Sequence, residues 1–470
     1  MTRRAFAQAR RLPLSFGGGV AIFLLFIVGY YLLGIAGLQL QSAQTGVTPL
    51  WPASGFALAM AYWYGMRFLL AILPAMLALA WQVDLPWTVA TIAALGSMLE
   101  AGVPLWLMRR LGIDPGLKHL RDALLFVLVG PLIGPVFSAT LGSIVVQQVE
   151  VNSFDFVKLW LLWWMGNSLG ILLVGGFGLV AVARRTLRME ARALAELLVA
   201  SAAALVIAGV GLMQVVNISS PLVLYLLIPV FVLIAQRGDQ LAVMSLGLVV
   251  LVLMLLSSAW LPPQSLEQHN LGVFYLDVSL LWVVTFTGMM ISSARHEMQA
   301  REQVTWLANH DPLTHLYNRH AFMQRLEDLL SGNAAESDRK VLLYIDLDHF
   351  KELNDAEGHL AGDHVLRDVS RLLLQEVRGI DTVARLGGDE FALILEDCNL
   401  RDARSIAEAI RQAIEEYLYI GNHGEHRIQA SIGLLELNAA HASPEDALYL
   451  VDSACYEAKR AGRNRVWVSP

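Results

Sequence analysis

The chain has 470 residues, of which 56% are hydrophobic and only 16% charged, and its net charge is −7. Soluble domains are about a quarter charged, so this composition excludes an ordinary soluble protein and indicates membrane segments. Residues 1–295 hold 16 Lys and Arg against 11 Asp and Glu, whereas residues 296–470 hold 18 against 30; the acidic second part lacks the basic face that a nucleic-acid partner requires.

Ten apolar stretches predict membrane-spanning helices in the first part of the chain. They lie near residues 16–38, 50–65, 68–83, 88–108, 123–147, 157–183, 194–216, 221–236, 240–261 and 272–293. A span needs about 20 apolar residues, so the second, third and eighth stretches fit short spans, re-entrant segments or merged segments. No small-residue cleavage site follows the first stretch, which predicts a retained span and not a cleaved signal peptide.

The loop charges predict the orientation of these spans. If the N-terminus is cytoplasmic, the loops on its side hold fifteen Lys and Arg, whereas the loops on the other side hold only Lys158. Cytoplasmic loops carry such an excess of positive charge. An even number of spans then returns the chain to the cytoplasm, so the N-terminus and the acidic part are both expected there.

Glu100 is the only acidic residue well inside an apolar stretch. A charge near the middle of the bilayer costs on the order of 3 kcal/mol on insertion scales, so such residues are often functional. The alternative is a span that is shifted toward the cytoplasm, with Glu100 satisfied by a neighbouring helix. The sequence leaves both interpretations open.

Two local patterns in the apolar part resemble a known family. Residues 51–58 read Trp-Pro-Ala-Ser-Gly-Phe-Ala-Leu, and residues 163–172 read Trp-Trp-Met-Gly-Asn-Ser-Leu-Gly-Ile-Leu. Both resemble the first class of bacterial membrane-associated sensor domains (MASE-type), which would cover roughly residues 15–295. Asn167 stands where this family leads us to expect an acid. The resemblance implies a polytopic sensor domain and does not identify its ligand.

Residues 296–309 predict a helical linker. Glu297 and Arg301 are spaced i,i+4, and apolar residues form a loose stripe at positions 294, 298, 304 and 307. This pattern suits a helix that pairs with a second copy of itself. An amphipathic connector without such pairing fits the short stripe equally well.

The acidic part predicts an α+β domain with an antiparallel sheet. Strands are expected at 341–347, 382–386, 391–395 and 428–437, and helices at 364–376 and 403–417. The second and third strands flank Gly387-Gly388-Asp389-Glu390, which predicts a hairpin. Glycine allows a close backbone approach to phosphate, and carboxylates suit Mg²⁺. If the first strand neighbours this hairpin, Asp346 brings a third carboxylate to one metal site.

Six motifs in order resemble the GGDEF family of diguanylate cyclases over about 160 residues. They lie at residues 311–319 (DPLTHLYNR), 346–351 (DLDHFK), 354–355 (ND), 358–363 (GHLAGD), 385–391 (RLGGDEF) and 458–465 (AKRAGRNR). His315 departs from the pattern, because glycine is usual there. The resemblance implies a ferredoxin-like nucleotide-cyclase palm fold at 310–470, which condenses two GTP into cyclic di-GMP and two pyrophosphates.

The resemblance also implies roles for individual residues. Asp346, the Leu347 carbonyl and Asp389 would hold Mg²⁺, with Mn²⁺ as an alternative, and Glu390 would be a metal ligand or the catalytic base. Asn354 and Asp363 would read the guanine edge, and His359 would flank the base. Gly387 and Gly388 would approach the phosphates, which Lys459 and Arg463 would bind from one helix face, four residues apart.

The same resemblance implies a homodimer, because each domain binds one GTP and thus holds half of an active site. Arg378 and Asp381, which lie six to nine residues before the glycine pair, would bind cyclic di-GMP and inhibit the enzyme. A multi-pass protein of the bacterial inner membrane is expected, with both ends cytoplasmic. Two other functions stay open: a catalytically inactive domain that only binds nucleotide, and a transporter with a regulatory tail.

Overall fold

The structure is a computed structural model. It describes residues 16–39, 48, 50–149, 155–184, 198–199, 201–202, 225, 227–237, 240–260, 271–331, 339–438 and 443–469. The chain divides into two compact units, Met1–Gln299 and Ala300–Pro470. Helix α14 (Leu271–Asn309) passes from the first unit into the second. The predicted domain limits at 295, 296–309 and 310 remain predictions.

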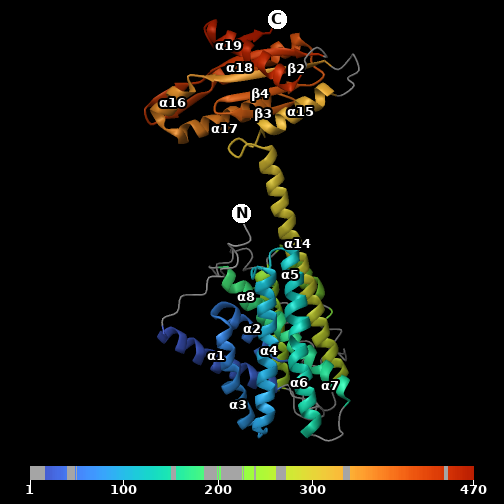
Figure 1. Ribbon diagram of the computed structural model, residues 1–470. Helices are drawn as coiled ribbons and strands as arrows, with labels where there is room; N and C mark the ends of the chain where they lie inside the picture. The colour runs from blue at the N-terminus through green and yellow to red at the C-terminus, as the bar shows by residue number, and fades with distance from the viewer. Residues whose placement is uncertain are drawn as a thin grey trace. The chain divides into compact units, whose positions relative to one another are not determined.

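The first unit consists of helices (Figure 1). They are α1 (Phe16–Leu38), α2 (Pro52–Tyr64), η1 (Met66–Ala71), α3 (Ile72–Gln82), α4 (Trp87–Leu111), α5 (Leu120–Val127), η2 (Leu128–Ile133), α6 (Gly134–Val149), α7 (Phe156–Gly170), η3 (Ile171–Gly175), α8 (Gly176–Ala183), α11 (Leu227–Arg237) and α12 (Gln240–Trp260), followed by α14. The elements η2 and η3 are π-helical segments inside longer helices. Such segments are frequent at functional sites.

Five helices in the described part of this unit are long and apolar enough to cross a membrane. They are Phe16–Leu38, Trp87–Leu111, Leu120–Gln148, Phe156–Ala183 and Leu276–Asn309. The second, third, eighth and ninth predicted stretches fall on shorter helical segments of the described chain. Most of the seventh, residues 194–216, lies outside the described residues. The described helices therefore make a multi-pass membrane protein, while the total of ten spans remains a prediction.

Helix ends follow local chemistry. Helix α4 begins directly after Pro86, ends before Gly112 at φ +66°, and carries Arg109 and Arg110 in its last turn. Proline fixes φ and is tolerated at a helix start, glycine adopts the left-handed conformation that ends a helix, and cations suit the negative end of the helix dipole.

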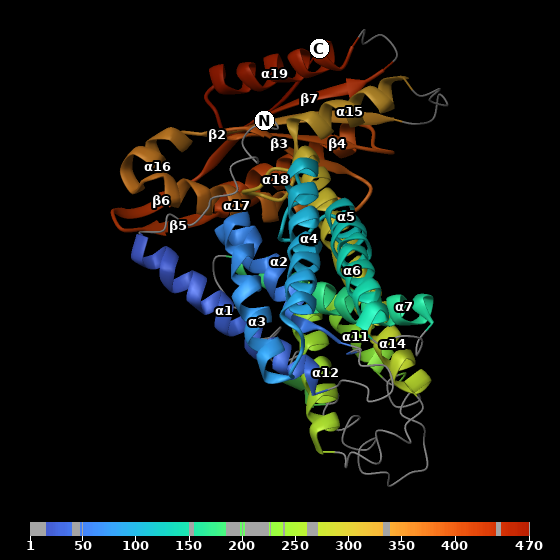
Figure 2. The ribbon, with the colours of Figure 1, turned by 60° about the horizontal axis from the view of Figure 1, so that its bottom comes forward.

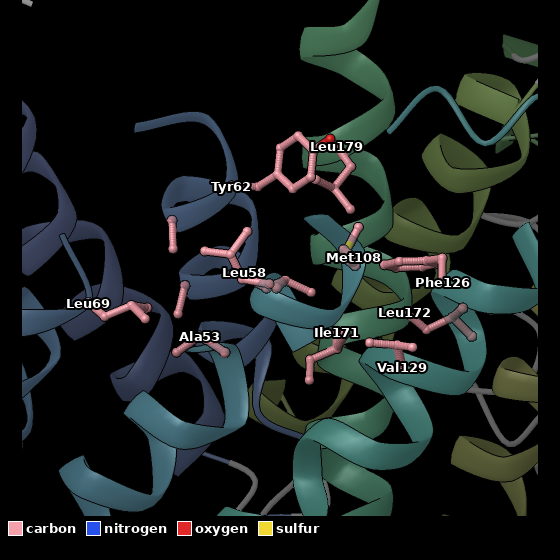
Figure 3. Packing of buried hydrophobic residues seen from close by; sticks show 14 of the residues in the cluster. Ala53, Leu58, Tyr62, Leu69, Met108, Phe126, Val129, Ile171, Leu172 and Leu179 are labelled. Atoms are coloured by element: carbon pink, nitrogen blue, oxygen red, sulfur yellow. The ribbon is translucent and has the colours of Figure 1, made fainter. Parts of the chain in front are cut away.

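The first unit buries a large apolar core between α2, α4, α5 and the η3–α8 segment. Figure 3 shows part of it, where Leu58, Met108 and Phe126 approach Ile171 and Leu172. Helix α2 and the α7–η3 segment meet along their backbones, since a Cβ added to Gly55 would lie 2.0 Å from the Gly170 carbonyl oxygen. The two sequence motifs that resemble the sensor family thus pack directly against each other, and glycine is required at this contact.

The second unit contains a six-stranded sheet and a separate two-stranded hairpin. Its strands are β1 (Tyr317–Asn318), β2 (Lys340–Asp348), β3 (Thr382–Gly387), β4 (Glu390–Leu395), β5 (Leu418–Gly421), β6 (Gly424–Arg427), β7 (Gln429–Leu437) and β8 (Val466–Val468). Its helices are α15 (Arg319–Ser331), α16 (Phe350–Glu357), α17 (His359–Glu376), α18 (Leu400–Glu416) and α19 (Pro444–Arg460).

The strand order β1-β3-β4-β2-β7-β8 confirms the predicted ferredoxin-like fold. The central strands β3, β4, β2 and β7 pair antiparallel, with helices α16 and α17 between β2 and β3 and helix α18 between β4 and β7. This β-α-β-β-α-β arrangement is the split βαβ topology of the palm. The four strands that the sequence predicts are all present, each within about two residues of its expected limits.

Alternation along β2 assigns its side chains to two cores. Val341, Leu343 and Ile345 pack in the core that includes residues of α17 and α18, whereas Leu342 and Tyr344 pack in the core that includes residues of α15 and α19. Figure 2 shows the strands between α19 on one side and α17 and α18 on the other. Since side chains alternate with a period of two, Asp346 follows Tyr344 onto the α19 face.

Candidate active site

Asp346 lies next to the Gly-Gly-Asp-Glu turn, as the sequence predicts. Strand β2 pairs with β4 so that Asp346 stands directly opposite Glu390, and the Leu347 amide donates to the Asp389 carbonyl oxygen at 3.3 Å. Residues directly opposite in an antiparallel pair point to the same face of the sheet. The register therefore brings the Asp346 and Glu390 side chains to one side of the turn.

The turn itself depends on glycine. Gly388 has φ +55°, in the left-handed region, and nothing lies within 4 Å of the position that a Cβ on Gly387 or Gly388 would take. The backbone of the turn is thus open to a ligand. Glycine both adopts this conformation without strain and leaves the approach free, which agrees with the predicted role beside phosphate.

The carboxylates of Asp346, Asp389 and Glu390 do not form a preformed metal cluster. Among the described residues, no three Asp, Glu, His or Cys side chains form a ready metal cluster. Asp346 instead accepts from Lys459 Nζ at 2.6 Å. Burial, together with the charges of Asp389 and Glu390, raises the pKa of Asp346 to about 6 against the opposing effect of Lys459. The donor oxygens are present at the turn, and Lys459 is a close neighbour of the metal residues.

The prediction that Lys459 and Arg463 share one helix face is wrong. Helix α19 ends at Arg460, and Gly462 and Arg463 have φ +115° and +60°, so Arg463 lies in the loop that follows. This loop is fixed because the Asn464 amide donates to Asp348 Oδ2 at 3.1 Å. Asp348, buried and also bonded to Ser431, therefore anchors the segment that carries Arg463.

Arg385 stabilises the Gly387–Gly388 turn by hydrogen bonds. The sequence alone did not predict this role. The Arg385 guanidinium donates to the Gly388 carbonyl oxygen at 2.8 and 3.0 Å and to Asp311 Oδ1 at 3.1 Å. Asp311 also accepts from the Thr314 amide and hydroxyl. Burial alone would raise the pKa of Asp311, but these bonds and the charge of Arg385 outweigh burial and lower the pKa. The charge-assisted bonds join the start of the domain to the turn.

The predicted guanine-reading residues come together where α16 meets α17. A Cβ added to Gly362 would lie 2.1 Å from Asn354 Oδ1, so the Asn354 side chain rests on the backbone beside Asp363. Gly358, with φ +86°, makes the bend between the two helices, and His359 is exposed at the start of α17. Asn354 thus lies against Gly362, the residue directly before Asp363, and a side chain at position 362 would displace it.

Glu357 anchors the β5–β6 hairpin to the end of α16. Its buried carboxylate accepts from the amides of Asn422 and His423 at 2.8 and 2.6 Å and contacts His426 Nε2 at 3.0 Å. A Cβ added to Gly421 would lie 2.4 Å from this carboxyl group. Burial alone would raise the pKa of Glu357, but the bonds from His426, His423 and Asn422 outweigh it and lower the pKa to about 2.

Replacing Glu357 with glutamine is expected to lower stability in a pH-dependent way. The folded pKa of about 2 lies below the ordinary value of 4.5, so the carboxylate stabilises the fold above pH 4.5 and this contribution is lost as the pH falls toward 2. The difference in Tm between wild type and Glu357→Gln should therefore shrink between pH 7 and pH 3.5. Glu352→Gln, on an exposed position of the same helix, serves as the control. An unchanged Tm difference across this range would contradict the assignment.

Arg378 and Asp381 are paired with each other. The Asp381 carboxylate is buried and accepts from the amides of Arg378 and Glu396 at 2.8 and 3.1 Å. The Arg378 guanidinium reaches Asp381 at 3.4 Å and the Glu396 carbonyl oxygen at 2.5 Å. Asp381 thus shapes the turn before β3, and the half-exposed Arg378 is the group of the pair that is open to a ligand.

In the first unit, Glu100 and Asn167 meet in a buried polar cluster. Asn167 Nδ2 donates to Glu100 Oε2 at 3.1 Å and to Ser138 Oγ at 3.0 Å. Glu100 Oε1 and Ser54 Oγ are buried and have no hydrogen-bond partner among the described atoms. Glu100 is therefore satisfied in part by a neighbouring helix, and Asn167 donates to the acid that α4 supplies.

Asn167→Asp is expected to destabilise the first unit by about 2 kcal/mol. The change removes the amide donor and sets a second carboxyl group against Glu100, and a buried acceptor without a donor costs about 1–3 kcal/mol. The double variant Glu100→Gln/Asn167→Asp exchanges the two groups and should recover most of the loss. Tm values of the four proteins in detergent form a double-mutant cycle; additive effects would show that the two side chains are not coupled.

The fold and site define a class: a polytopic helical membrane unit followed by a nucleotide-cyclase palm. Residues 21–299 match the family model MASE1, and residues 308–465 match the model described as diguanylate cyclase, GGDEF domain. The chain belongs to the MASE1 family and carries a GGDEF domain after the membrane unit.

Similar proteins share mainly the second unit. The probable diguanylate cyclase DgcE of Escherichia coli (strain K12) is 40% identical over 180 residues, which are 38% of this chain and 16% of that protein. The probable diguanylate cyclase DgcT of the same organism is 31% identical over 207 residues, 43% of this chain and 45% of that protein. A solved structure of the coiled coil and GGDEF domain of DgcB from Caulobacter crescentus, in complex with c-di-GMP, is 30% identical and covers 37% of this chain and 93% of that chain, with a TM-score of 0.36. The chain thus spans less than half of the length of both curated relatives.

Proposed function

We propose that this protein is a membrane-bound diguanylate cyclase, which condenses two GTP into cyclic di-GMP and two pyrophosphates at the cytoplasmic face of the bacterial inner membrane. The observation that carries the proposal is the pairing of Asp346 with Glu390 beside the Gly387–Gly388 turn. The GGDEF match over residues 308–465 and the DgcE and DgcT likenesses support it.

The residues at the turn fit a magnesium ion, with manganese as an alternative. Asp346, Asp389, Glu390 and the Leu347 carbonyl offer hard oxygen ligands, and Mg²⁺ needs only one or two protein carboxylates besides substrate phosphates and water. When bound, the ion would neutralise charge on the transferred phosphoryl group. Lys459, at 2.6 Å from Asp346, is placed to add a positive charge to the same phosphates.

The chain's own residues bind and orient GTP. Asn354 and Asp363 accept and donate hydrogen bonds at the guanine edge, with His359 beside the base, and adenine would leave the Asp363 carboxylate without its donors. Arg463 binds phosphate from the loop after α19. Glu390 either takes the proton of the attacking 3′-hydroxyl or holds the metal. The 3′-oxygen bonds to the α-phosphorus of the second GTP, and pyrophosphate leaves.

The reaction requires two copies of the domain, because each holds one GTP. Positioning the two substrates face to face supplies a high effective concentration. The linker part of α14 offers a surface for pairing, since Met298, Val304 and Leu307 are 61%, 68% and 48% exposed. A homodimer through this stripe would bring the domains together, and the membrane unit would control the rate by changing their geometry.

The test is pyrophosphate release and cyclic di-GMP formation by the full-length protein in detergent, with GTP and Mg²⁺. Asp389→Ala/Glu390→Ala should lower both by at least a thousandfold while the dimer persists. Glu416→Ala, an exposed acid on α18, controls for loss of charge. A folded, dimeric wild-type protein that binds GTP without releasing pyrophosphate would favour the alternative of a binding module.

Product feedback through Arg378 is a further part of the proposal. Arginine binds the guanine O6 and N7 atoms in bidentate fashion, and Arg378 can turn to a ligand while Asp381 keeps its two backbone bonds. Arg378→Ala should leave the initial rate unchanged and let cyclic di-GMP accumulate beyond the wild-type plateau. Inhibition by added product that is equal in wild type and variant would reject this site.

A further inference from the structure

A pocket lies in the first unit where four segments of the chain meet. It is lined by the α4–α5 loop (Asp114, Gly116 and Lys118), by Arg184 at the end of α8, by Gln240 at the start of α12 and by His296 on α14. The pocket is partly open, and its volume is about 150 Å³. This volume is enough for a small polar ligand with some of its water.

The described lining of the pocket holds two cations and one acid, beside uncharged and apolar residues. Lys118 and Arg184 contribute cations, and their charges together with that of Arg295 act on the His296 ring. Among the described residues, Asp114 is the one acid in the lining, and its Oδ1 already accepts from the Gly116 amide at 2.7 Å. Converging positive charge in a partly enclosed, low-dielectric site favours an anion.

Gln240 makes the pocket more specific than a patch of interfacial cations. Its side chain is 2% exposed, and Nε2 donates to the carbonyl oxygens of Leu117 and Met289 at 3.1 and 2.9 Å and to the Ser293 hydroxyl. Its Oε1 is buried and accepts no hydrogen bond from the described residues. A buried acceptor without a donor is costly, so a ligand that supplies an O–H group is favoured.

We propose that this pocket binds a phosphate group that carries a hydroxyl: cations at Lys118 and Arg184 hold the phosphoryl oxygens, and Gln240 Oε1 accepts the O–H. Two sources share this chemistry. One is a soluble phosphate compound, and the other is an anionic lipid whose headgroup has a hydroxyl, either on the phosphate (phosphatidic acid) or on the attached glycerol (phosphatidylglycerol). Sulfate has the charge without the proton at neutral pH, so it would leave Gln240 unpaired and bind more weakly.

The pocket borders α14, the helix that continues into the second unit. His296 belongs to α14, which runs without a break to Asn309. A bound anion would join α14 to the α4–α5 loop and to α8 through its charge. Any effect on cyclic di-GMP synthesis rests on the proposed function, whereas binding at the pocket does not.

Binding is tested on the full-length protein in a phosphate-free zwitterionic detergent, without GTP. Inorganic phosphate should bind by titration calorimetry, and Lys118→Ala and Arg184→Ala should each weaken it at least tenfold, as should the replacement of phosphate by sulfate. Arg67→Ala and Arg110→Ala, whose side chains stack on Phe68 and Trp106, are matched controls and should bind as wild type does.

The lipid source is tested by native mass spectrometry of protein reconstituted with phosphatidylglycerol or phosphatidic acid. A lipid headgroup is supported by two results together. Wild type and Arg67→Ala retain these lipids whereas Lys118→Ala does not, and phosphate no longer binds when the lipids are present. Phosphate binding that these lipids leave unchanged supports a soluble ligand. Equal binding of phosphate and lipid in the pocket variants and the controls overturns the proposal, and Lys118→Gln repeats the test should Lys118→Ala lose its fold.

Discussion

Asp346→Asn is expected to lower the rate of the proposed GTP condensation roughly a thousandfold. A metal ion supplies several kcal/mol of charge stabilisation in phosphoryl transfer, and each 1.36 kcal/mol corresponds to a factor of ten. Asp346 stands opposite Glu390 and offers a carboxylate at the turn, whereas an amide binds Mg²⁺ far more weakly. Initial rates over a range of Mg²⁺ concentrations, and Mn²⁺ binding followed by electron paramagnetic resonance, measure the loss.

Asp348→Asn is the matched control for this experiment. Asp348 lies two residues further along β2 on the same face, but it bonds to Ser431 and to the Asn464 amide and not to the turn. This variant should lose stability and keep its Mn²⁺ affinity. If Asp346→Asn bound Mn²⁺ as tightly as wild type, the assignment of Asp346 as a metal ligand would fail.

Gly433→Ala is expected to destabilise the second unit by about 3 kcal/mol. Gly433 lies in β7 under α19, and a Cβ there would lie 2.3 Å from the Val451 carbonyl oxygen and 2.6 Å from the Cys455 nitrogen. Both are backbone atoms of the helix, so the whole of α19 must move away from a close-packed sheet. Since α19 carries Lys459, the displacement should also separate Lys459 from Asp346 and lower the rate.

Thermal unfolding and initial rates of the full-length protein measure both effects of Gly433→Ala. Gly379→Ala is the control for stability, because nothing lies within 4 Å of the position that its Cβ would take. A Gly433→Ala protein with wild-type Tm would show that α19 does not rest on β7 as tightly as these distances require.

The strands and their neighbours could be predicted because their sequence signals are local. The apolar run 341–347 and the two runs around the glycine pair fix three strands, and a hairpin makes its two strands neighbours. The pairing of β2 with β4 involves residues over 40 positions apart, and the sequence reached it only through the family resemblance. The π-helical segments and the contact of Gly55 with Gly170 depend on how helices pack, which periodicity does not encode.

The parts of the site that were missed or mistaken depend on backbone conformation and distant partners. The spacing of Lys459 and Arg463 suits one helix face, but Gly462 ends the helical geometry and Asp348, more than 110 residues earlier, fixes the loop. Arg385 and Asp311 are separated by 74 residues. The sequence offered one signal for this ion pair. An arginine stands two residues before the glycine pair, and an aspartate opens the domain.

His315 illustrates how a departure in the sequence is accommodated. It has φ +62°, which explains why glycine is usual there, and its ring lies 5.4 Å from that of Trp306. A left-handed conformation costs a residue with a side chain about 1–2 kcal/mol. The ring contact is available to offset part of this cost.

The last turn of α14 is held to strand β1 by a hydrogen bond and by stacked rings. Asn318 donates to the Ala308 carbonyl oxygen at 2.8 Å, and the His310 ring stacks between those of Trp306 and Tyr317. Tyr317 and Asn318 form β1, which lies beside β3, and Arg385 of β3 grips the Gly388 carbonyl oxygen. Rotation of this final turn would therefore be transmitted to the Gly387–Gly388 turn through β1, β3 and the hydrogen bonds of Arg385.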